Sequence, residues 1–458
     1  MLPTKIVVIG AGSASFGLNT LGALMRSKKL AGSQLALVDQ NPETLELVCR
    51  LAERINREWD AHISISSFTH SEQALPGAKF VVSAIEVPPR ERLWRQDFDI
   101  TLRHGVRQPY SENGGPGGFA HAARNIGPVL KIAHAMEQAC PDAWFINYTN
   151  PMMRICDAVS RYSKIKVVGL CHQIYYGYGM VAFLLADRLG LRPPEDPYME
   201  SMDKIWEAVH DAALRFDIKA AGLNHFTWML DIRDRQTGED LYPLVRERWA
   251  KADPDFEPLT HRVLDAFGLM PIPGDTHLSE YMPWVSDPLT RPWEKYHLRL
   301  FDWEDAERRR DTGLKDINKL ASGQKSIARL KKSDSEGALE IIEAIAGAGN
   351  HYHLAVNLPN ESAVPNLPQG AIIETPGLIS GMGAHAVPVG PLPEPVAELL
   401  RREITRVHLS VDAAANGDRQ AALQCLLLDP VITDIETAKE ILDDYLWTYK
   451  QYLPQFWE

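Results

Sequence analysis

A strand, a glycine loop, a helix and a second strand ending in an acidic residue follow one another at the start of this 458-residue chain. Residues 5–9 read K-I-V-V-I, an apolar run typical of a buried strand, and residues 10–17 read G-A-G-S-A-S-F-G. Residues 34–38 read Q-L-A-L-V, and Asp39 follows them directly. Strands and helices that alternate in this way form a doubly wound parallel sheet, which constrains the fold more than any other feature.

The glycine loop indicates a dinucleotide site. Gly10 and Gly12 stand where the backbone must approach a pyrophosphate resting on the N-terminus of the next helix. Ser15 replaces the third glycine, so the strict G-x-G-x-x-G pattern is broken, and a glycine turn in another α/β protein is the alternative. Asp39 is placed to bind the ribose hydroxyls, which favours NAD over its phosphorylated form. We expect NAD to contact Gly10, Gly12, Ser13, Ala14, Phe16 and Asp39.

The alternation of strands and helices continues to about residue 195 and then fades. Before that point, apolar runs predict strands over 80–85, 143–148 and 166–170, and helical spacing predicts a helix over 125–138. Beyond it, helical stretches cover 301–320, 395–416 and 434–451. We expect a Rossmann-like NAD-binding domain over 1–195 and a packed α+β catalytic domain over 196–458, an α/β architecture like that of lactate and malate dehydrogenases.

Composition excludes several classes of function. The chain has 48 basic and 60 acidic residues, a net charge of -12, so a nucleic-acid partner is not expected. Its apolar runs are far shorter than the roughly 18 residues that a membrane helix needs. Five scattered cysteines do not suggest a disulfide framework, which fits a reducing cytoplasm.

Two polar segments follow predicted strands in the middle of the chain. Cys171 and His172 close one strand, and His225 follows another over 219–223. A thiolate and an imidazole are suitable ligands for a divalent ion, and two protein ligands would leave positions open for water or substrate. The spacing is not that of a zinc finger, and a buried cysteine or a structural histidine is the alternative.

Taken in order, the motifs resemble those of glycoside hydrolase family 4, the NAD- and manganese-dependent glycosidases. The resemblance covers nearly the whole chain and rests on K-I-V-V-I-G-A-G-S-A at 5–14, Asn150-Pro151, G-L-C-H at 169–172, G-L-N-H at 222–225, M-P-I-P-G-D-T at 270–276 and V-N-L-P-N at 356–360. It implies that NAD oxidises the C3 hydroxyl of the sugar, that a base removes the acidified C2 proton beside the metal, and that the glycosidic oxygen leaves by elimination. Water then adds, and C3 is reduced again.

The resemblance also implies roles for single residues. Cys171 and His225 match the metal ligands, and Asn150 matches the residue that holds a sugar hydroxyl beside the ion. Asp275 matches the base of the branch that acts on unphosphorylated α-glucosides. Tyr281 is the alternative, because a tyrosine has that role in the phospho-glycosidase branch.

The identity of residue 172 indicates which class of substrate the enzyme accepts. A histidine after the metal-binding cysteine is typical of members that act on unphosphorylated sugars. His172 is either the acid that assists the leaving oxygen or a residue that orients a metal ligand. The segment 111–118, S-E-N-G-G-P-G-G, resembles the family loop that faces the substrate, so we expect Glu112 and Asn113 to bind sugar hydroxyls.

The same glycine-rich segment resembles the branch of α-galacturonidases and α-galactosidases. We favour a uronide, an α-galacturonide or α-glucuronide, with α-galactosides and α-glucosides as alternatives. A uronic acid requires a cation, for which arginine is best suited, and the candidates are Arg90, Arg92, Arg95, Arg291 and Arg299. A hydroxy-acid dehydrogenase and a non-catalytic sensor are the competing functions. A homo-oligomer, a dimer or tetramer, is expected from the family.

Overall fold

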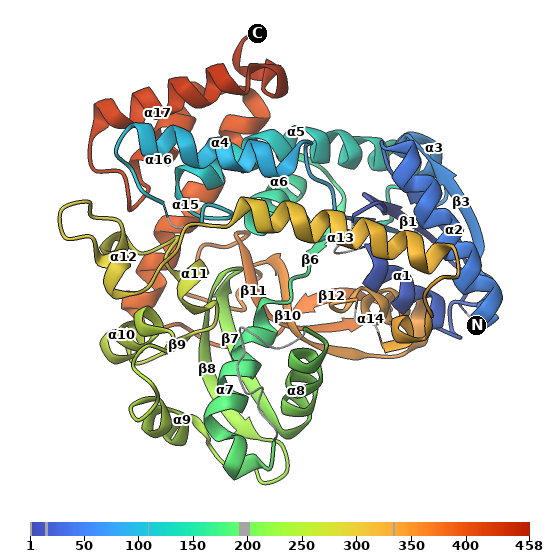
Figure 1. The fold of residues 1–458 in the computed structure, drawn as a ribbon, viewed down its shortest axis with the longest axis horizontal. Coiled ribbons are helices and arrows are strands. Elements are labelled where there is room, and N and C mark those ends of the chain that lie inside the picture. The colour runs from blue at the N-terminus through green and yellow to red at the C-terminus, as the bar shows by residue number, and fades with distance from the viewer. Residues whose placement is uncertain (1, 14–16, 109, 192–201, 333–334) are drawn as a thin grey trace.

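The computed structural model describes residues 2–13, 17–108, 110–191, 202–332 and 335–458. Its strands join into one sheet in the order β3-β2-β1-β4-β5-β6-β10-β11-β7-β8-β9, with β12 beside β11 (Figure 1). The first six strands are parallel: β1 (Lys5–Ile9), β2 (Gln34–Val38), β3 (Ser64–Phe68), β4 (Phe80–Ser83), β5 (Trp144–Asn147) and β6 (Lys166–Gly169). This is the doubly wound order that the sequence predicts.

An antiparallel section extends the same sheet. Its strands are β7 (Phe216–Leu223), β8 (Phe226–Asp234), β9 (Met270–Pro271), β10 (His351–Pro359), β11 (Ile372–Ser380) and β12 (Gly383–Ala386). The junction is the pairing of β10 with β6, where Asn357 lies opposite Gly169. The sheet therefore continues across residue 195, and the domain boundary proposed there stays a prediction.

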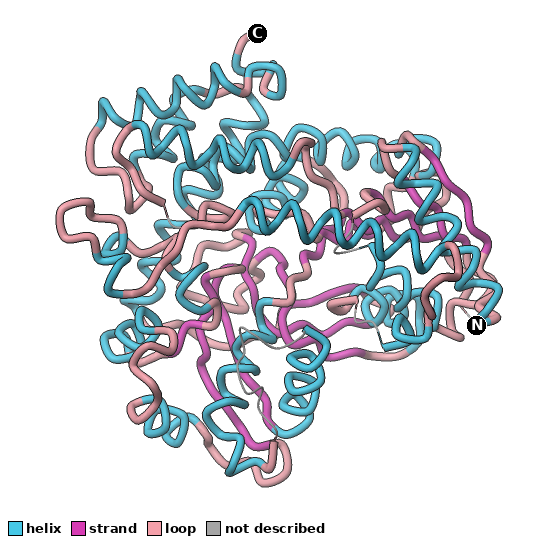
Figure 2. Tube along the Cα trace, viewed as in Figure 1, coloured by secondary structure: helices cyan, strands magenta, loops and turns pink. Residues whose placement is uncertain are grey.

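Helices surround the sheet, as the tube in Figure 2 shows. In the first half they are α1 (Gly17–Arg26), α2 (Pro42–Trp59), α3 (Ser71–Ala74), α4 (Arg90–Arg103), α5 (Gly115–Ala139), α6 (Met152–Tyr162) and α7 (Gln173–Leu189). In the second half they are α8 (Met202–Arg215), α9 (Tyr242–Trp249), α10 (Pro258–Phe267), α11 (Gly274–Leu278), α12 (Pro292–Lys295), α13 (Trp303–Ala321), α14 (Ala338–Glu343), α15 (Glu394–Asn416), α16 (Arg419–Leu427) and α17 (Ile435–Thr448).

Side-chain alternation along the central strands builds a core on each face of the sheet. In β1, Val7 and Ile9 join the apolar cluster that includes α5, α6 and α15, while Ile6 and Val8 join the cluster that includes α1, α2 and α13. Helices from the second half of the chain thus cover both faces of the parallel section. Among the described helices, none has both the length and the apolarity needed to span a bilayer.

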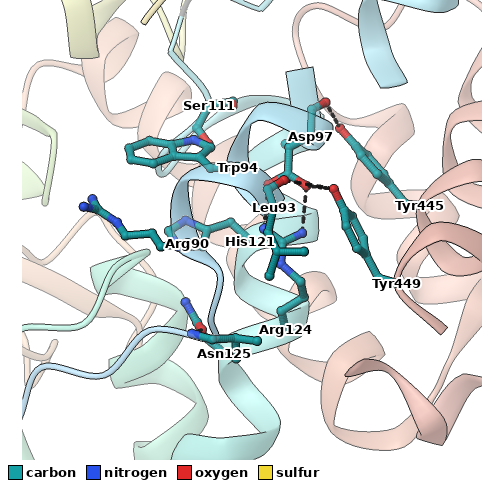
Figure 3. A network of polar contacts seen from close by, with 12 residues as sticks. Arg90, Leu93, Trp94, Asp97, Ser111, His121, Arg124, Asn125, Tyr445 and Tyr449 are labelled. Carbon is teal, nitrogen blue, oxygen red and sulfur yellow. Dashed lines mark hydrogen bonds and ion pairs between the residues drawn. The ribbon is translucent and has the colours of Figure 1, made fainter. Parts of the chain in front are cut away.

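Helix α17 is attached to the first half of the chain by a buried polar network (Figure 3). The Asp97 carboxylate on α4 accepts two hydrogen bonds from the Arg124 guanidinium on α5, at 2.7 Å each, and one from the Tyr449 hydroxyl at 2.6 Å. The hydroxyl of Tyr445 donates to the backbone oxygen of Asp97 at 2.9 Å. All four side chains are buried.

The expected α/β class is confirmed, and most of the expected elements are present. The prediction for residues 115–118 was wrong: they are not loop but the first turn of α5, which begins ten residues before the expected helix. Pro116 suits a first helical turn, and the N–H of Gly118 binds the oxygen of Gly114 at 3.2 Å. A Cβ at Gly118 would lie 2.6 Å from the oxygen of Asn113, so only glycine permits this close approach.

Candidate active site

Several of the expected site residues lie near the carboxyl-terminal edge of the parallel strands. Asn150 follows β5, Cys171 follows β6, and Glu112 and Asn113 lie just before α5. His225 comes from the β7–β8 hairpin, in which Leu223 pairs with Phe226. Open α/β sheets bind their ligands at this edge.

Cys171 and His225 lie close enough to share one ion. The Cys171 sulfur is 3.5 Å from His225 Nε2. Sulfur and nitrogen ligands about 2.3 and 2.1 Å from one ion, as for zinc, lie about 3.1 to 3.6 Å apart at tetrahedral or octahedral angles. The donor chemistry and the spacing therefore fit a divalent metal.

The protonation of both groups fits the same function. Burial, and then the charges of His277 and His172, lower the pKa of His225 well below its ordinary range, so its imidazole is neutral and able to bind a metal. Burial, and then the charges of Glu374 and Glu336, raise the pKa of the Cys171 thiol. A divalent ion would favour the thiolate form.

A buried carboxylate fixes the hairpin that carries His225. Glu374 on β11 accepts hydrogen bonds from Asn224 Nδ2 at 2.7 Å, from the Thr227 hydroxyl at 2.6 Å and from Asn357 Nδ2 at 3.2 Å. His225 has a left-handed backbone, with φ of 63°. Glu374 thus holds the turn between β7 and β8, and with it His225, in place.

Glu112, Asn113 and Asn150 form one polar group beside His225. Asn150 Nδ2 donates to Glu112 Oε1 at 3.0 Å, and Asn113 Nδ2 lies 2.7 Å from His225 Nδ1. Glu112 Oε2 is 3.6 Å from the same ring nitrogen. These side chains offer carboxylate and amide groups that could bind sugar hydroxyls next to an ion.

His172 lies at the more open side of this group. Its side chain is 60% exposed, and Nδ1 is 3.2 Å from Glu336 Oε1. The charge of Glu336 raises the pKa of His172, because it stabilises the imidazolium. A protonated imidazole near neutral pH is able to donate a proton.

Asp275 is buried on α11 and contacts α10. Its two oxygens accept the backbone N–H groups of Leu259, at 2.8 Å, and Thr260, at 2.7 Å. Burial raises its pKa, and these two hydrogen bonds act in the opposite direction. Glu257 accepts the backbone N–H of Asp275, and burial, followed by the charge of Asp275, raises the pKa of Glu257 to about 8.

Tyr281 is buried with its ring stacked on Phe226, 4.6 Å between centroids and 4° between planes. Burial raises the pKa of its hydroxyl well above the ordinary range, which makes it a poor proton acceptor at neutral pH. Burial raises the pKa of both Asp275 and Tyr281, and the choice of base between them stays a prediction.

The glycine loop has the close packing of a phosphate-binding turn. Gly10 has φ of +82°, and a Cβ there would lie 2.3 Å from the oxygen of Ala84 at the end of β4. The N–H of Gly12 donates to Asp39 Oδ2 at 2.8 Å, and that of Ser13 to the oxygen of Gly10 at 3.0 Å. The small residues thus bring backbone to the edge of the sheet where a dinucleotide would bind. Ala14 and Phe16 lie outside the described residues.

Several polar residues of the site were not assigned a role from the sequence. His277 contacts His225, with 3.9 Å between ring centroids and 37° between ring planes, and its Nδ1 is 2.9 Å from Glu280 Oε1. His121 Nε2 is 2.9 Å from Glu86 Oε1, and its Nδ1 is 3.0 Å from the oxygen of Glu112. The i, i+3 spacing of His277 and Glu280, at the end of α11, was the signal available in the sequence.

Comparison with known proteins gives matches over nearly the whole chain. The model of the family 4 glycosyl hydrolases matches residues 5–186, and that of the family's C-terminal domain matches residues 220–432. An α-glucosidase of Erwinia rhapontici is 31% identical over 96% of this chain and 97% of its own. An α-galactosidase of Bacillus subtilis is 28% identical (99% of both chains), and an α-galacturonidase of Thermoanaerobacterium saccharolyticum is 27% identical (98% and 96%).

Solved structures share the fold. A structure described as a glucosidase of Bacillus subtilis superposes with a TM-score of 0.84 at 26% identity, over 97% of this chain and 100% of that one. A 6-phospho-α-glucosidase from gut microorganisms, solved with NAD and Mn²⁺, has a TM-score of 0.78 at 22% identity, over 99% of each chain.

Proposed function

Because the chain belongs to family 4 of the glycosyl hydrolases, we propose that it hydrolyses unphosphorylated α-glycosides with NAD and a divalent cation such as Mn²⁺, and that its sugar is a uronide. The contact that carries the proposal is Cys171 Sγ to His225 Nε2, 3.5 Å, beside the hydrogen-bonded side chains of Glu112 and Asn150. A thiolate and a neutral imidazole next to hydroxyl-binding groups suit an ion that binds the sugar.

The edge of the sheet supports both cofactors. The turn at Gly10 and Gly12 and the acid Asp39 at the end of β2 support NAD. Cys171 and His225 would hold the cation. When bound, NAD would supply a hydride acceptor and donor for C3, and the cation would supply electrostatic stabilisation of negative charge at the sugar oxygen.

The protein side chains would then move the protons and orient the sugar. We propose that Asp275 removes the C2 proton and that His172, with its pKa raised by Glu336, protonates the leaving glycosidic oxygen. Asn150, Glu112 and Asn113 would hold the C2 and C3 hydroxyls beside the ion.

Arg90 is the candidate for a uronate carboxylate. Its guanidinium carbon lies 5.1 Å from the centre of the Trp94 ring (Figure 3). Its Nε is 3.9 Å from Glu86 Oε2. Glu86 binds His121, which contacts the backbone of Glu112. This chain of contacts connects Arg90 to the site. Relatives named α-galacturonidase add support.

A panel of p-nitrophenyl α- and β-glycosides, neutral and uronic, tests the proposal. NAD, Mn²⁺ and a reductant are added singly and together. We expect release from an α-uronide that requires both cofactors. Release from a neutral α-galactoside or α-glucoside instead would show that the sugar is not a uronide, while the proposed hydrolysis with NAD and Mn²⁺ would still hold. Steady NADH formation from a free sugar acid, without hydrolysis, would contradict the proposal. We also expect a homo-oligomer, which light scattering would test.

A further inference from the structure

His277 and His225 come from different parts of the chain, and their rings are in contact. The ring centroids are 3.9 Å apart, and the planes are inclined by 37°. Glu112, His225 and His277 each offer a ligand atom within 4.8 Å of the others. Ligand atoms about 2.1 Å from one ion lie at most about 4.2 Å apart, so shifts of a few tenths of an ångström would bring these atoms around it.

A buried carboxylate fixes the orientation of His277. Glu280, 2% exposed, lies with Oε1 2.9 Å from His277 Nδ1. Its Oε2 accepts the backbone N–H groups of Asn113 and Gly114, at 2.8 Å each. Because a carboxylate only accepts, Nδ1 is the ring nitrogen that donates in this contact, and Nε2 is the nitrogen not engaged by Glu280.

Glu280 also joins α11 to the segment that carries Glu112. A Cβ at Gly114 would lie 2.6 Å from the backbone oxygen of Glu280, so the two segments are in direct contact. Metal-binding histidines typically donate their second N–H to a carboxylate or carbonyl in this way. His277 thus has an oriented ring and an adjacent carboxylate.

We propose that His277 is a third protein ligand of the divalent ion held at His225, and that Glu280 is its positioning residue. The inference rests on the proposed function, since it extends the same metal site. Neither residue was assigned a role by the family resemblance. A further imidazole would make the ion bind more tightly before the sugar arrives, and would leave fewer positions for water.

Metal binding measured directly, with NAD present, tests the inference without activity. Free Mn²⁺ is followed by electron paramagnetic resonance during titration of wild type, His277→Ala, Glu280→Gln and Cys171→Ser. The matched control is His385→Ala, a histidine exposed on β12. We expect His277→Ala and Glu280→Gln each to weaken Mn²⁺ binding about ten- to a hundredfold or more, and His385→Ala to change nothing.

Co²⁺ in place of Mn²⁺ gives a second readout. In His277→Ala, the absorption bands of the Co²⁺ ion itself should change while the sulfur-to-cobalt band of Cys171 persists. Thermal unfolding and NAD binding show whether each variant folds. If His277→Ala does not fold, His277→Gln, which keeps a polar side chain of similar length, replaces it.

The outcomes separate this inference from the proposed function. Wild-type Mn²⁺ affinity and Co²⁺ spectrum in folded His277→Ala, with binding lost in Cys171→Ser, would overturn the role of His277 and keep the metal site. Unchanged affinity in both variants would overturn the site itself.

Discussion

Cys171 and His225 are 54 residues apart in sequence, and the sheet brings the sulfur of one to 3.5 Å from Nε2 of the other. Cys171 follows a parallel strand in the first half of the chain, and His225 lies in the turn of an antiparallel hairpin in the second half. Between β6 and β7 the sheet inserts β10 and β11, which hold the hairpin through Glu374. The site therefore depends on the union of both halves.

Replacing Cys171 tests the metal site through activity. We expect Cys171→Ser to lower Mn²⁺-dependent turnover at least about a hundredfold, because a serine hydroxyl is a poor substitute for a thiolate, while NAD binding is retained. Turnover and NAD fluorescence titration are measured together. Cys49→Ser, on α2 far from the site in sequence, is the control. Normal turnover of Cys171→Ser at limiting Mn²⁺ would remove Cys171 from the site.

Exchange of the C2 proton identifies the base. We expect Asp275→Asn to slow exchange with solvent deuterium about 10²- to 10⁴-fold, since the amide cannot accept the proton but still accepts an N–H of α10. Tyr281→Phe should exchange at the wild-type rate. The opposite pair of results would assign the base to Tyr281.

Arg90 is tested by comparing two sugars. If its guanidinium binds the uronate, Arg90→Lys should lose about ten- to a hundredfold in kcat/KM for the α-uronide, the value of a charge-assisted pair of hydrogen bonds. Hydrolysis of a neutral α-galactoside should stay unchanged. Arg95→Lys, an exposed arginine on the same helix, serves as control. An equal loss on both sugars would argue against carboxylate recognition.

Glu257 makes stability depend on pH. Its pKa is about 8 in the fold against an ordinary value of 4.5, so the folded protein holds this proton more tightly than the unfolded chain. The resulting stabilisation is complete below about pH 4.5 and is lost as the pH rises through 8. We expect Glu257→Gln to flatten the dependence of Tm on pH between 5 and 8 and to raise Tm at pH 8 by a few degrees.

Calorimetry across this pH range measures the effect. Glu304→Gln, which changes an exposed glutamate at the start of α13, should reproduce the wild-type profile. A Glu257→Gln profile parallel to that of wild type would contradict the raised pKa.

The network in Figure 3 predicts a large loss of stability. Arg124→Met leaves the buried Asp97 carboxylate without its cation and should cost about 3 to 5 kcal/mol. Tyr449→Phe removes one hydrogen bond to that carboxylate and should cost about 1 kcal/mol. Chemical denaturation measures both. Arg95→Met, which breaks an exposed pair with Asp99 at 3.9 Å, should cost less than about 0.5 kcal/mol, and equal losses in all three variants would be inconsistent.

Local pattern predicted the parallel half of the fold well. The apolar runs over 5–9 and 34–38 are β1 and β2 with the expected bounds, because short buried strands between turns leave little freedom of register. The strands of the antiparallel half were harder to predict from the sequence. Strand β10 is nine residues long, and its first half mixes histidine and tyrosine with exposed positions, a pattern unlike the apolar runs of the buried parallel strands.

The site was predictable where a strand end marks it. Cys171, Asn150 and the Gly10 turn follow apolar runs, so their common edge could be expected. The roles of His277 and Glu280 could not be assigned from their spacing alone. Those roles depend on the contact of His277 with the ring of His225 and of Glu280 with the backbone of Asn113. Those contacts arise only from tertiary packing.

The pairing of β10 with β6 also has a consequence for folding during synthesis of the chain. Residues 351–359 are synthesised long after residues 166–169, so the growing polypeptide carries β6 as an unpaired edge throughout that interval. Open strand edges with apolar faces promote association between chains. We expect expression at slow translation or high temperature to yield aggregates seeded by this edge, and chaperones that shelter nascent chains to raise the yield of native enzyme.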